Sequence, residues 1–314
     1  MSVAASTSRH LPVMLNQVME SLAVRPGGRY VDATVGEGGH AERILEQSAP
    51  DGLLLGVDRD EQALTRMRAW LGRFGPRLIP RQESFERVAQ VLPEIGWLDG
   101  ADGVLLDLGV STLQLGTAER GFAFASEGPL DMRMDRREPY TAEDLLATLG
   151  ERELTELLRR FGEERAARRI SRSIIASRPL RTTADLRRAV LAAGVRGRPG
   201  HDPATRTFQA LRIGVNDELG RLERFLAEGW RLLRPGARMV ILSYHSLEDR
   251  LVKEAFRRWS ADCLCPVRQP VCTCGWRARV RPLNRRRQRP DPSEVARNPR
   301  ARSAGLRAVE RLAA

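Results

Sequence analysis

Short apolar runs alternate with longer stretches of helical periodicity over the first hundred residues of the chain. The clearest apolar runs are RYVDATV (29–35), LLLGVD (53–58) and GVLLDLGV (103–110), and a further one, RMVILS, follows at 238–243. This alternation is typical of a parallel sheet with crossover helices. Because the last of these strands comes after a long interruption, we expect the sheet to be split in sequence. The segment LRAVERL (306–312) predicts an antiparallel edge strand.

Helical periodicity replaces the strand signal between residues 113 and 212. Apolar side chains recur at the spacing i, i+3, i+4, i+7 in Leu154, Leu157, Leu158 and Phe161. Gly150 and Gly162 stand where helix C-caps are expected. Thr182 with Asp185 predicts a capping box that begins another helix, which should end before Gly194.

The two patterns together predict an α/β fold interrupted by an inserted all-helical domain. We assign the discontinuous core to residues 1–112 and 213–314, and the helical insertion to residues 113–212. A chain of 314 residues with 42% hydrophobic content is long enough for two such domains.

The charge balance points to a polyanionic partner. The formal net charge is +12 and the sequence pI about 10.9, and Lys253 is the one lysine in the chain. Arginine is the side chain best suited to bidentate phosphate contacts, so nucleic acid is the first partner to consider. The N-terminal residues do not read as a signal peptide, and no apolar run approaches the roughly 18 residues that a spanning helix needs. We therefore expect a cytoplasmic protein without membrane contact.

A glycine-rich loop connects the first strand to the helix that follows it. In VDATVGEGGHAERIL, Gly36, Gly38 and Gly39 permit close backbone approach, and the helix N-terminus suits an anionic group. Asp58 ends the second strand, where an acid can accept both ribose hydroxyls of a nucleoside cofactor. These residues fit NAD and S-adenosylmethionine equally well, and a simple tight turn is a third interpretation.

Further candidate residues follow the later strands at the same edge of the sheet. Asp107 ends the run LLD beside the expected topological switch point, where an acid can face the reacting centre, although it could also cap the next loop. Tyr244 could stack on a base, and His245 could be catalytic or merely structural. Ser246 and Asp249 have capping-box spacing and are expected to begin a helix.

Two other sequence features carry possible functions. The segment EERAARRISRSII places one basic stripe opposite an apolar face, which would neutralise phosphates or simply face solvent; the stripe consists of Arg165, Arg168, Arg169 and Arg172. Four cysteines form the pattern C-x-C-x6-C-x-C, which could fill a tetrahedral zinc site. The spacing is unusual for zinc fingers, and we expect reduced thiols that bind no metal; these are Cys263, Cys265, Cys272 and Cys274.

The chain resembles the bacterial 16S ribosomal RNA cytosine-N4 methyltransferase family, called RsmH or MraW. The matching stretches run in family order along nearly the whole chain: HLPVMLNQV, VDATVGEGGH, GVDRD, LLDLGVST, ERGFAF with GPLDMRMD, TRTFQALRIGVNDEL, SYHSLEDRLVK and NPRARSAGLR. Small departures are Thr112, where a second serine is expected, and Tyr244, where phenylalanine is common. In amine methyltransferases a Pro-Pro-aromatic run usually follows the strand-end acid, whereas this chain has Leu-Gly-Val after Asp107.

The resemblance implies a Rossmann-like class I methyltransferase sheet and S-adenosylmethionine as cofactor. The family's cofactor positions correspond to Gly38, Gly39, His40, Asp58, Phe85, Asp107 and Gln114. Phe85 would lie against the adenine, and Gln114 would close the pocket. The implied substrate is a cytidine of 16S rRNA within the small ribosomal subunit, and both a monomer and a homodimer remain open.

The implied reaction is direct in-line transfer of a methyl group to cytosine N4, without a covalent protein intermediate or an obligatory metal. Asp107 would hold the N–H groups of the amine, with Tyr244 or His245 packing the base. The resemblance gives the cysteine quartet no part in this chemistry. A nicotinamide-dependent oxidoreductase and a catalytically silent RNA-binding factor are the alternatives.

Overall fold

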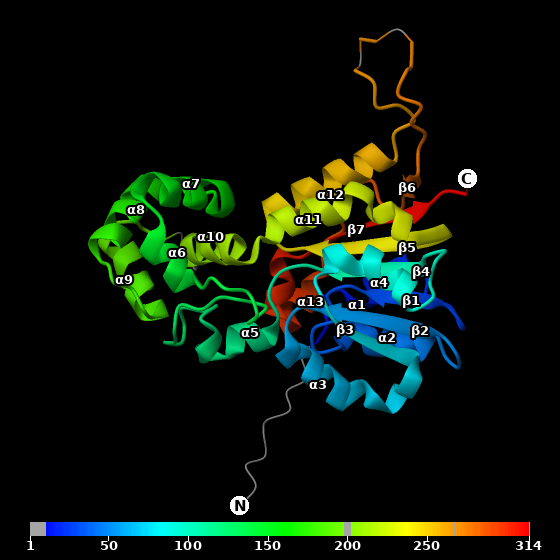
Figure 1. Cartoon of the computed structure of the whole chain (residues 1–314), viewed down its shortest axis with the longest axis horizontal. Coiled ribbons are helices and arrows are strands. Elements are labelled where there is room, and N and C mark those ends of the chain that lie inside the picture. The colour runs from blue at the N-terminus through cyan, green and yellow to red at the C-terminus, as the bar shows by residue number, and fades with distance from the viewer. Residues whose placement is uncertain (1–10, 198–201, 267, 270, 314) are drawn as a thin grey trace, which may run out of the picture. The chain divides into compact units, whose positions relative to one another are not determined.

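A computed structural model describes residues 11–197, 202–266, 268–269 and 271–313. His10, the first residue of the family stretch HLPVMLNQV, lies outside the described residues. The chain divides into two compact units, the first made of Met1–Gly109 with Leu222–Ala314 and the second of Val110–Arg221 (Figure 1). In the described parts of the chain, no helix is both long and apolar enough to span a membrane.

The first unit is built on a seven-stranded sheet of order β3-β2-β1-β4-β5-β7-β6. The first five strands in this order pair in parallel, and β7 and β6 are antiparallel additions. The order reverses between β1 and β4, as a doubly wound sheet requires. The strands are β1 (Arg29–Asp32), β2 (Leu53–Asp58), β3 (Leu78–Gln82), β4 (Ala101–Asp107), β5 (Leu233–Ser243), β6 (Val280–Pro282) and β7 (Gly305–Arg311).

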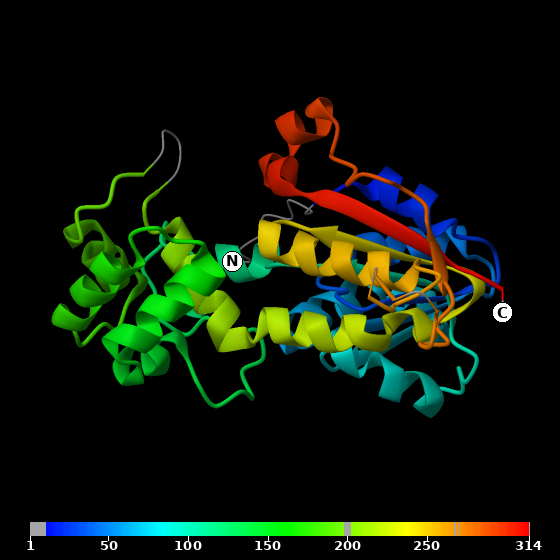
Figure 2. The ribbon, with the colours of Figure 1, turned by 90° about the horizontal axis from the view of Figure 1, so that it is seen from above.

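Helices cover both faces of this sheet, which is why its central strands are apolar on both sides. Along β4, Val104 and Leu106 point into one core, which contains side chains of α4, α11 and α12. Leu105 points into the opposite core, with side chains of α1, α2 and α3. Figures 1 and 2 show α11 and α12 running side by side. The helices are α1 (Leu15–Leu22), α2 (Gly39–Gln47), α3 (Glu61–Leu71), α4 (Val88–Glu94), α11 (Glu218–Glu228), α12 (Ser246–Trp259) and α13 (Pro292–Arg297).

The C-terminal strand does not take the edge position that its sequence suggested. β7 pairs antiparallel with β5, as expected, but β6 pairs with the other side of β7. The short segment Val280–Pro282 carries too few residues to give a strand signal of its own, and it forms the edge. Ending an edge in a three-residue strand with a proline limits pairing with other chains.

The second unit consists of helices around its own apolar core. Its helices are α5 (Thr112–Gly116), α6 (Ala142–Thr148), α7 (Glu151–Gly162), α8 (Ala167–Ala176), α9 (Thr183–Ala192) and α10 (Thr205–Asn216). The periodic residues Leu154 and Leu158 are fully buried there, and Ile170 and Ile174 bury the apolar face of α8. The predicted capping box of Thr182 and Asp185 begins α9, and Gly194 follows its end with φ +67°.

The second unit extends beyond residue 212, where the sequence pattern placed its end. Beyond that position Val215 packs against the helical core, and Asn216 and Arg221 bond to Met132 and Glu138 of the same unit, which ends at Arg221. At the other boundary the unit begins at Val110, shortly before the expected position.

Two glycines in this unit have other roles than the expected C-caps. Gly150 is the N-cap of α7, and its N–H donates to Glu153 Oε2 at 2.9 Å. Gly162 is the last residue of α7, whose C-cap is Glu163. A Cβ on Gly162 would lie 2.7 Å from the carbonyl oxygen of Arg206, so this glycine permits the close approach of α7 to α10.

Asn216 ties the end of α10 to the loop before α6. Its side-chain amide donates to the carbonyls of Met132 (2.7 Å) and Arg212 (2.8 Å), and its Oδ1 accepts from Met134 N–H (2.8 Å). Asn216→Ala removes these hydrogen-bond partners from the buried backbone of Met132 and Met134. We expect it to lower the free energy of unfolding by about 2–4 kcal/mol, measured by urea denaturation. Val110→Ala, at a partly buried position of the same unit, is the control; an Asn216→Ala variant as stable as this control would contradict the prediction.

Candidate functional site

Three carboxylates end three neighbouring strands of the first unit. Asp32 ends β1, Asp58 ends β2 and Asp107 ends β4, and these strands lie side by side in the sheet. The carboxyl ends of parallel strands at the reversal of strand order are where ligands bind in open α/β sheets. The sequence predicted this place for Asp58 and Asp107.

The glycine-rich loop connects β1 to the N-terminus of α2. Gly38 is the N-cap residue, with φ +93°, and as a glycine it offers no side-chain capping bond to the first N–H groups of α2. Cβ atoms on Gly38 and Gly39 would lie 2.7 Å from Leu71 Cδ1 and Pro12 Cγ, respectively. The two glycines therefore let the helix begin close to its neighbours and leave an uncapped N-terminus that suits an anionic group.

Asp58 is held in place by two backbone N–H groups. Its Oδ2 accepts from Gly36 and its Oδ1 from Asp60, both at 2.9 Å. Burial raises the pKa of Asp58, and these two hydrogen bonds oppose that effect. The carboxylate links β2 to the glycine-rich loop, and each oxygen retains acceptor capacity for a ligand hydroxyl.

Asp107 is held by groups from the loops that follow β1 and β5. The Tyr244 hydroxyl donates to Asp107 Oδ1 at 2.7 Å, and the Asp107 N–H donates to Thr34 Oγ1 at 2.6 Å. Burial is the main cause, and the charge of Asp107 the second, that raises the pKa of Tyr244 well above its usual value. The phenol therefore stays protonated and remains a hydrogen-bond donor. The Asp107 side chain is 24% exposed. The site thus presents a fixed carboxylate that a substrate can reach.

His40 is a neutral, buried residue beside this carboxylate. Burial lowers the pKa of His40 to about 4. Its Nε2 lies 3.0 Å from the carbonyl oxygen of Val13, which can only accept, so Nε2 carries the proton. The unprotonated Nδ1 then lies 3.7 Å from Asp107 Oδ2, and this contact is not an ion pair. His40 connects the segment before α1 to the glycine-rich loop.

His245 is the N-cap of α12 and forms the capping box that the sequence assigned to Ser246 and Asp249. His245 Nδ1 accepts from the N–H of Glu248, and Glu248 Oε2 accepts in return from the N–H of His245. α12 begins at Ser246, as expected, but the capping box predicted for Ser246 and Asp249 does not form, because Asp249 instead pairs with Arg307, at 2.8 and 3.0 Å. The ring of His245 is therefore occupied in a helix cap.

Two of the cofactor positions implied by resemblance have clear local surroundings. Phe85 follows β3 and packs edge-on against Phe225 of α11, with ring centroids 5.8 Å apart. Gln114 lies in the second unit, where its side chain forms a capping box with Ser111 at the start of α5. Its proposed role in closing the pocket stays a prediction.

Asp32 was not among the predicted site residues, although it lies in the stretch VDATVGEGGH. Asp32 is 1% exposed, and its Oδ1 accepts from the N–H of Thr34 at 3.3 Å. Burial raises the pKa of Asp32 to about 8, and the charges of Asp107 and Asp58 act in the same direction. An acid at the end of β1, like those at the ends of β2 and β4, was the signal that could have identified it.

The raised pKa of Asp32 predicts a pH-dependent stability. Above its unfolded pKa of 3.8 the unfolded chain loses a proton that the folded chain keeps up to about pH 8. The contribution of Asp32 to the free energy of unfolding therefore falls as the pH rises from about 4 to about 8. Asp32→Asn does not titrate, so its free energy of unfolding lacks this pH-dependent fall. The difference between the free energy of unfolding of the variant and that of the wild type should therefore increase by a few kcal/mol from about pH 4 to about pH 8, at about 1.4 kcal/mol per pH unit. Urea denaturation at several pH values checks this, and parallel pH profiles would contradict it.

Comparison with known proteins identifies the family. Residues 7–312 match the sequence pattern of the MraW methylase family. The chain belongs to the MraW methylase family. It is similar to the ribosomal RNA small subunit methyltransferase H of Geobacter sulfurreducens, with 51% identity over 98% of this chain and all of that protein. The protein of the same name from Symbiobacterium thermophilum is 50% identical over 97% of both chains.

Membership of the MraW methylase family makes this protein a methyltransferase, with the expected Rossmann-like α/β sheet. Among solved structures, an rRNA methylase from Streptococcus thermophilus has a TM-score of 0.40 at 12% identity, over 97% of this chain and 100% of that one. So weak a likeness adds nothing to the family assignment, which rests on the sequence relatives.

Proposed function

We propose that this methyltransferase uses S-adenosylmethionine to methylate N4 of one specific cytidine in 16S rRNA of the small ribosomal subunit. The observation that carries the proposal is the carboxylate of Asp107 at the carboxyl end of β4, which the Tyr244 hydroxyl orients while Thr34 holds the Asp107 backbone N–H. The names of the relatives support ribosomal RNA of the small subunit as the substrate.

The residues of the first unit fit the proposed cofactor. The uncapped N-terminus of α2, beginning at Gly39, suits the carboxylate of the methionine part. Asp58, fixed by Gly36 and Asp60, can accept the two ribose hydroxyls. Phe85 offers a ring edge for the adenine. When bound, S-adenosylmethionine supplies a methyl group activated by its sulfonium.

Asp107 would orient the amine that receives the methyl group. The lone pair of a cytosine amine is delocalised into the ring, so the amine is a poor nucleophile and must be aligned. A carboxylate that accepts an N–H of the amine holds it in line, and well-oriented reactants gain roughly 7–11 kcal/mol from positioning. As the N4–carbon bond forms and the carbon–sulfur bond breaks, the amine loses one proton, for which the Asp107 carboxylate is the nearby acceptor.

The second unit offers exposed arginines for RNA phosphates. Arg165 lies in the turn before α8 rather than on the helix, which begins at Ala167. Arg168 and Arg172 both pair with Glu151 of α7, at 3.5 and 2.9 Å. Within the described residues Arg165 and Arg169 form no ion pair and are exposed, so these two are the better candidates for phosphate contacts.

Loss of Arg165 and Arg169 should weaken RNA binding and its salt dependence. If both contact phosphates, the double alanine variant reduces the slope of log affinity against log salt by roughly 1 per arginine. The measurement is binding of small-subunit RNA at several salt concentrations. A control that removes the same charge from the first unit, Arg43→Ala with Arg231→Ala, should leave the slope near that of the wild type. Equal slopes for all three proteins would contradict the assignment.

The activity is tested by incubating the purified protein with labelled S-adenosylmethionine and small ribosomal subunits from cells that lack the gene. Nucleoside mass spectrometry of the recovered RNA should find N4-methylcytidine at one site. Large subunits and free cytidine serve as substrate controls and should remain unlabelled.

The other outcomes separate the rival functions. NAD binding in place of S-adenosylmethionine binding would indicate an oxidoreductase. Cofactor and RNA binding without any transferred label would indicate an RNA-binding factor that keeps the fold. Label on another atom of the RNA would refute the cytosine N4 assignment and leave the methyltransferase assignment intact.

A further inference from the structure

The four cysteines bring their sulfur atoms together in a loop of the first unit, after α12. All four Sγ atoms lie within 4.8 Å of one another. Cys263 Sγ is 3.4 Å from Cys272 Sγ and 3.7 Å from Cys274 Sγ, and the last two are 3.6 Å apart. A tetrahedral zinc with Zn–S bonds of about 2.3 Å has sulfur atoms about 3.8 Å apart. The measured separations are close to the edges of that tetrahedron.

Among the described residues of the loop, polar contacts and not apolar packing hold the tip: Gln269 Nε2 donates to the Val271 carbonyl (3.0 Å) and to Thr273 Oγ1 (2.8 Å). Leu264 is 38% exposed and Val271 is 70% exposed, so these two apolar side chains of the loop do not belong to a core. The base is anchored, because Arg258 and Arg279 lie over the Trp276 ring at 5.9 and 5.2 Å. Beyond this base, the convergent sulfur atoms are the main contacts between the two arms. Small segments without a core usually depend on a metal or a disulfide, and all four thiols are free here.

Backbone N–H groups point at three of the sulfur atoms. Leu264 N–H donates to Cys274 Sγ and Cys265 N–H to Cys263 Sγ, both at 3.3 Å, and Thr273 N–H donates to Cys265 Sγ at 3.4 Å. Such donors stabilise thiolates, the form that binds metals, and orient metal ligands from outside the coordination sphere.

We propose that Cys263, Cys265, Cys272 and Cys274 bind one Zn²⁺ in a closed, structural site. Four protein ligands leave no open position for a substrate, so the metal stabilises the loop and takes no part in methyl transfer. The positive ion also removes the repulsion among four thiolates that lie this close. This inference replaces the expectation of metal-free thiols that the unusual spacing suggested.

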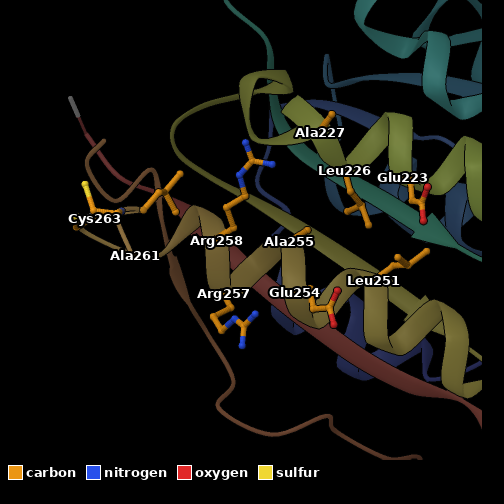
Figure 3. A pocket seen from close by; sticks show the side chains of 12 residues that line it. Glu223, Leu226, Ala227, Leu251, Glu254, Ala255, Arg257, Arg258, Ala261 and Cys263 are labelled. Atoms are coloured by element: carbon orange, nitrogen blue, oxygen red, sulfur yellow. Dashed lines mark hydrogen bonds between the residues drawn. The ribbon is translucent and has the colours of Figure 1, made fainter. Parts of the chain in front are cut away.

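The loop also forms one end of a groove between α11 and α12. The groove has a volume of about 650 Å³, and its lining includes Leu226 and Ala255 from the helices and Cys263, Leu264 and Cys265 from the loop (Figure 3). Loss of zinc should therefore increase the mobility of the loop residues that form one end of this groove. Faster hydrogen exchange of the backbone in residues 262–276, with unchanged exchange in β4 and β5, is the expected signature.

Zinc content of the full-length protein tests the proposal directly. Protein purified under reducing conditions without chelators should contain about one zinc per chain by mass spectrometry. Cys272→Ser with Cys274→Ser should lose it, whereas Val271→Ala, which alters the same loop and keeps the thiols, should retain it. Co²⁺ added to metal-free wild-type protein should produce the strong visible absorption of tetrahedral thiolate coordination, which does not depend on the folding of any variant.

Several results would overturn the proposal. Wild-type protein without zinc, which neither binds added Zn²⁺ nor gives the Co²⁺ spectrum, would show that the thiols are not ligands. Zinc retained by the double serine variant would place the metal elsewhere. Resistance of all four thiols to a thiol reagent in the presence of zinc, and their rapid reaction after chelation, is expected; rapid reaction under both conditions would also refute it.

Discussion

Asp107→Asn should lower the rate of methyl transfer by roughly 10²–10³-fold, the effect of removing one preorganised electrostatic partner from an active site. The amide keeps the size of the side chain but offers one acceptor oxygen in place of two and carries no charge. Tyr244 OH can still donate to that oxygen, at the position it now occupies 2.7 Å from Asp107 Oδ1. Single-turnover methylation of small subunits gives the rate, and equilibrium binding of S-adenosylmethionine should change much less.

Tyr244→Phe is the matched control, because it removes the orienting hydroxyl and leaves the Asp107 carboxylate in place. Its rate should fall by a smaller factor, on the order of 10-fold, the cost of about one hydrogen bond. If Asp107→Asn has a rate within about threefold of the wild type, Asp107 does not orient the amine. Equal losses of rate and cofactor affinity would mean that Asp107 acts through cofactor binding instead.

Asp58→Asn should weaken S-adenosylmethionine binding by roughly 100-fold. Two hydrogen bonds from ribose hydroxyls to a carboxylate contribute about 1.5–3 kcal/mol each, and an amide can accept only one of them well. Each tenfold loss of affinity corresponds to about 1.4 kcal/mol. Isothermal titration calorimetry with S-adenosylmethionine measures the change, and the rate at saturating cofactor should stay near that of the wild type.

The control for Asp58→Asn must separate cofactor binding from local damage, because Asp58 also accepts from Gly36 and Asp60. Asp51→Asn removes the same charge at an exposed position of the first unit and should bind the cofactor as the wild type does. Circular dichroism and urea denaturation of the Asp58 variant report the state of the loop. Unchanged affinity in a well-folded variant would rule out the ribose contact.

The apolar runs predicted the central strands β1, β2, β4 and β5, because strands buried on both faces are apolar at nearly every position. β3 and β6 were not among the predicted strands. The strand ends then indicated Asp58 and Asp107, since a parallel sheet collects its carboxyl ends at one edge. Tyr244 could be placed at the same edge, but its hydrogen bond to Asp107 depends on the pairing of β4 with β5 across a long interruption. The position of Phe85 came from the family resemblance alone.

Features that depend on tertiary packing could not be predicted from the sequence pattern. Asp249 has the spacing of a capping residue, yet its carboxylate pairs with Arg307 of β7. His245 caps α12 instead. Gly162 has the sequence position of a C-cap, but its role comes from the contact with the backbone of Arg206. Asp32 shows the same limit, since its raised pKa results from burial among strands that are distant in sequence.

The place of β7 between β5 and β6 has a consequence for the newly made chain. β5 ends at Ser243, and its partner begins only at Gly305. At about 5–20 residues per second, a ribosome needs roughly 3–12 s to synthesise the intervening stretch. During that time the hydrogen-bonding edge of β5 has no β7 to pair with, and open edges recruit other strands. Translation that stops before Gly305 should therefore yield an aggregating product, even though the helices of Val110–Arg221 are complete by then.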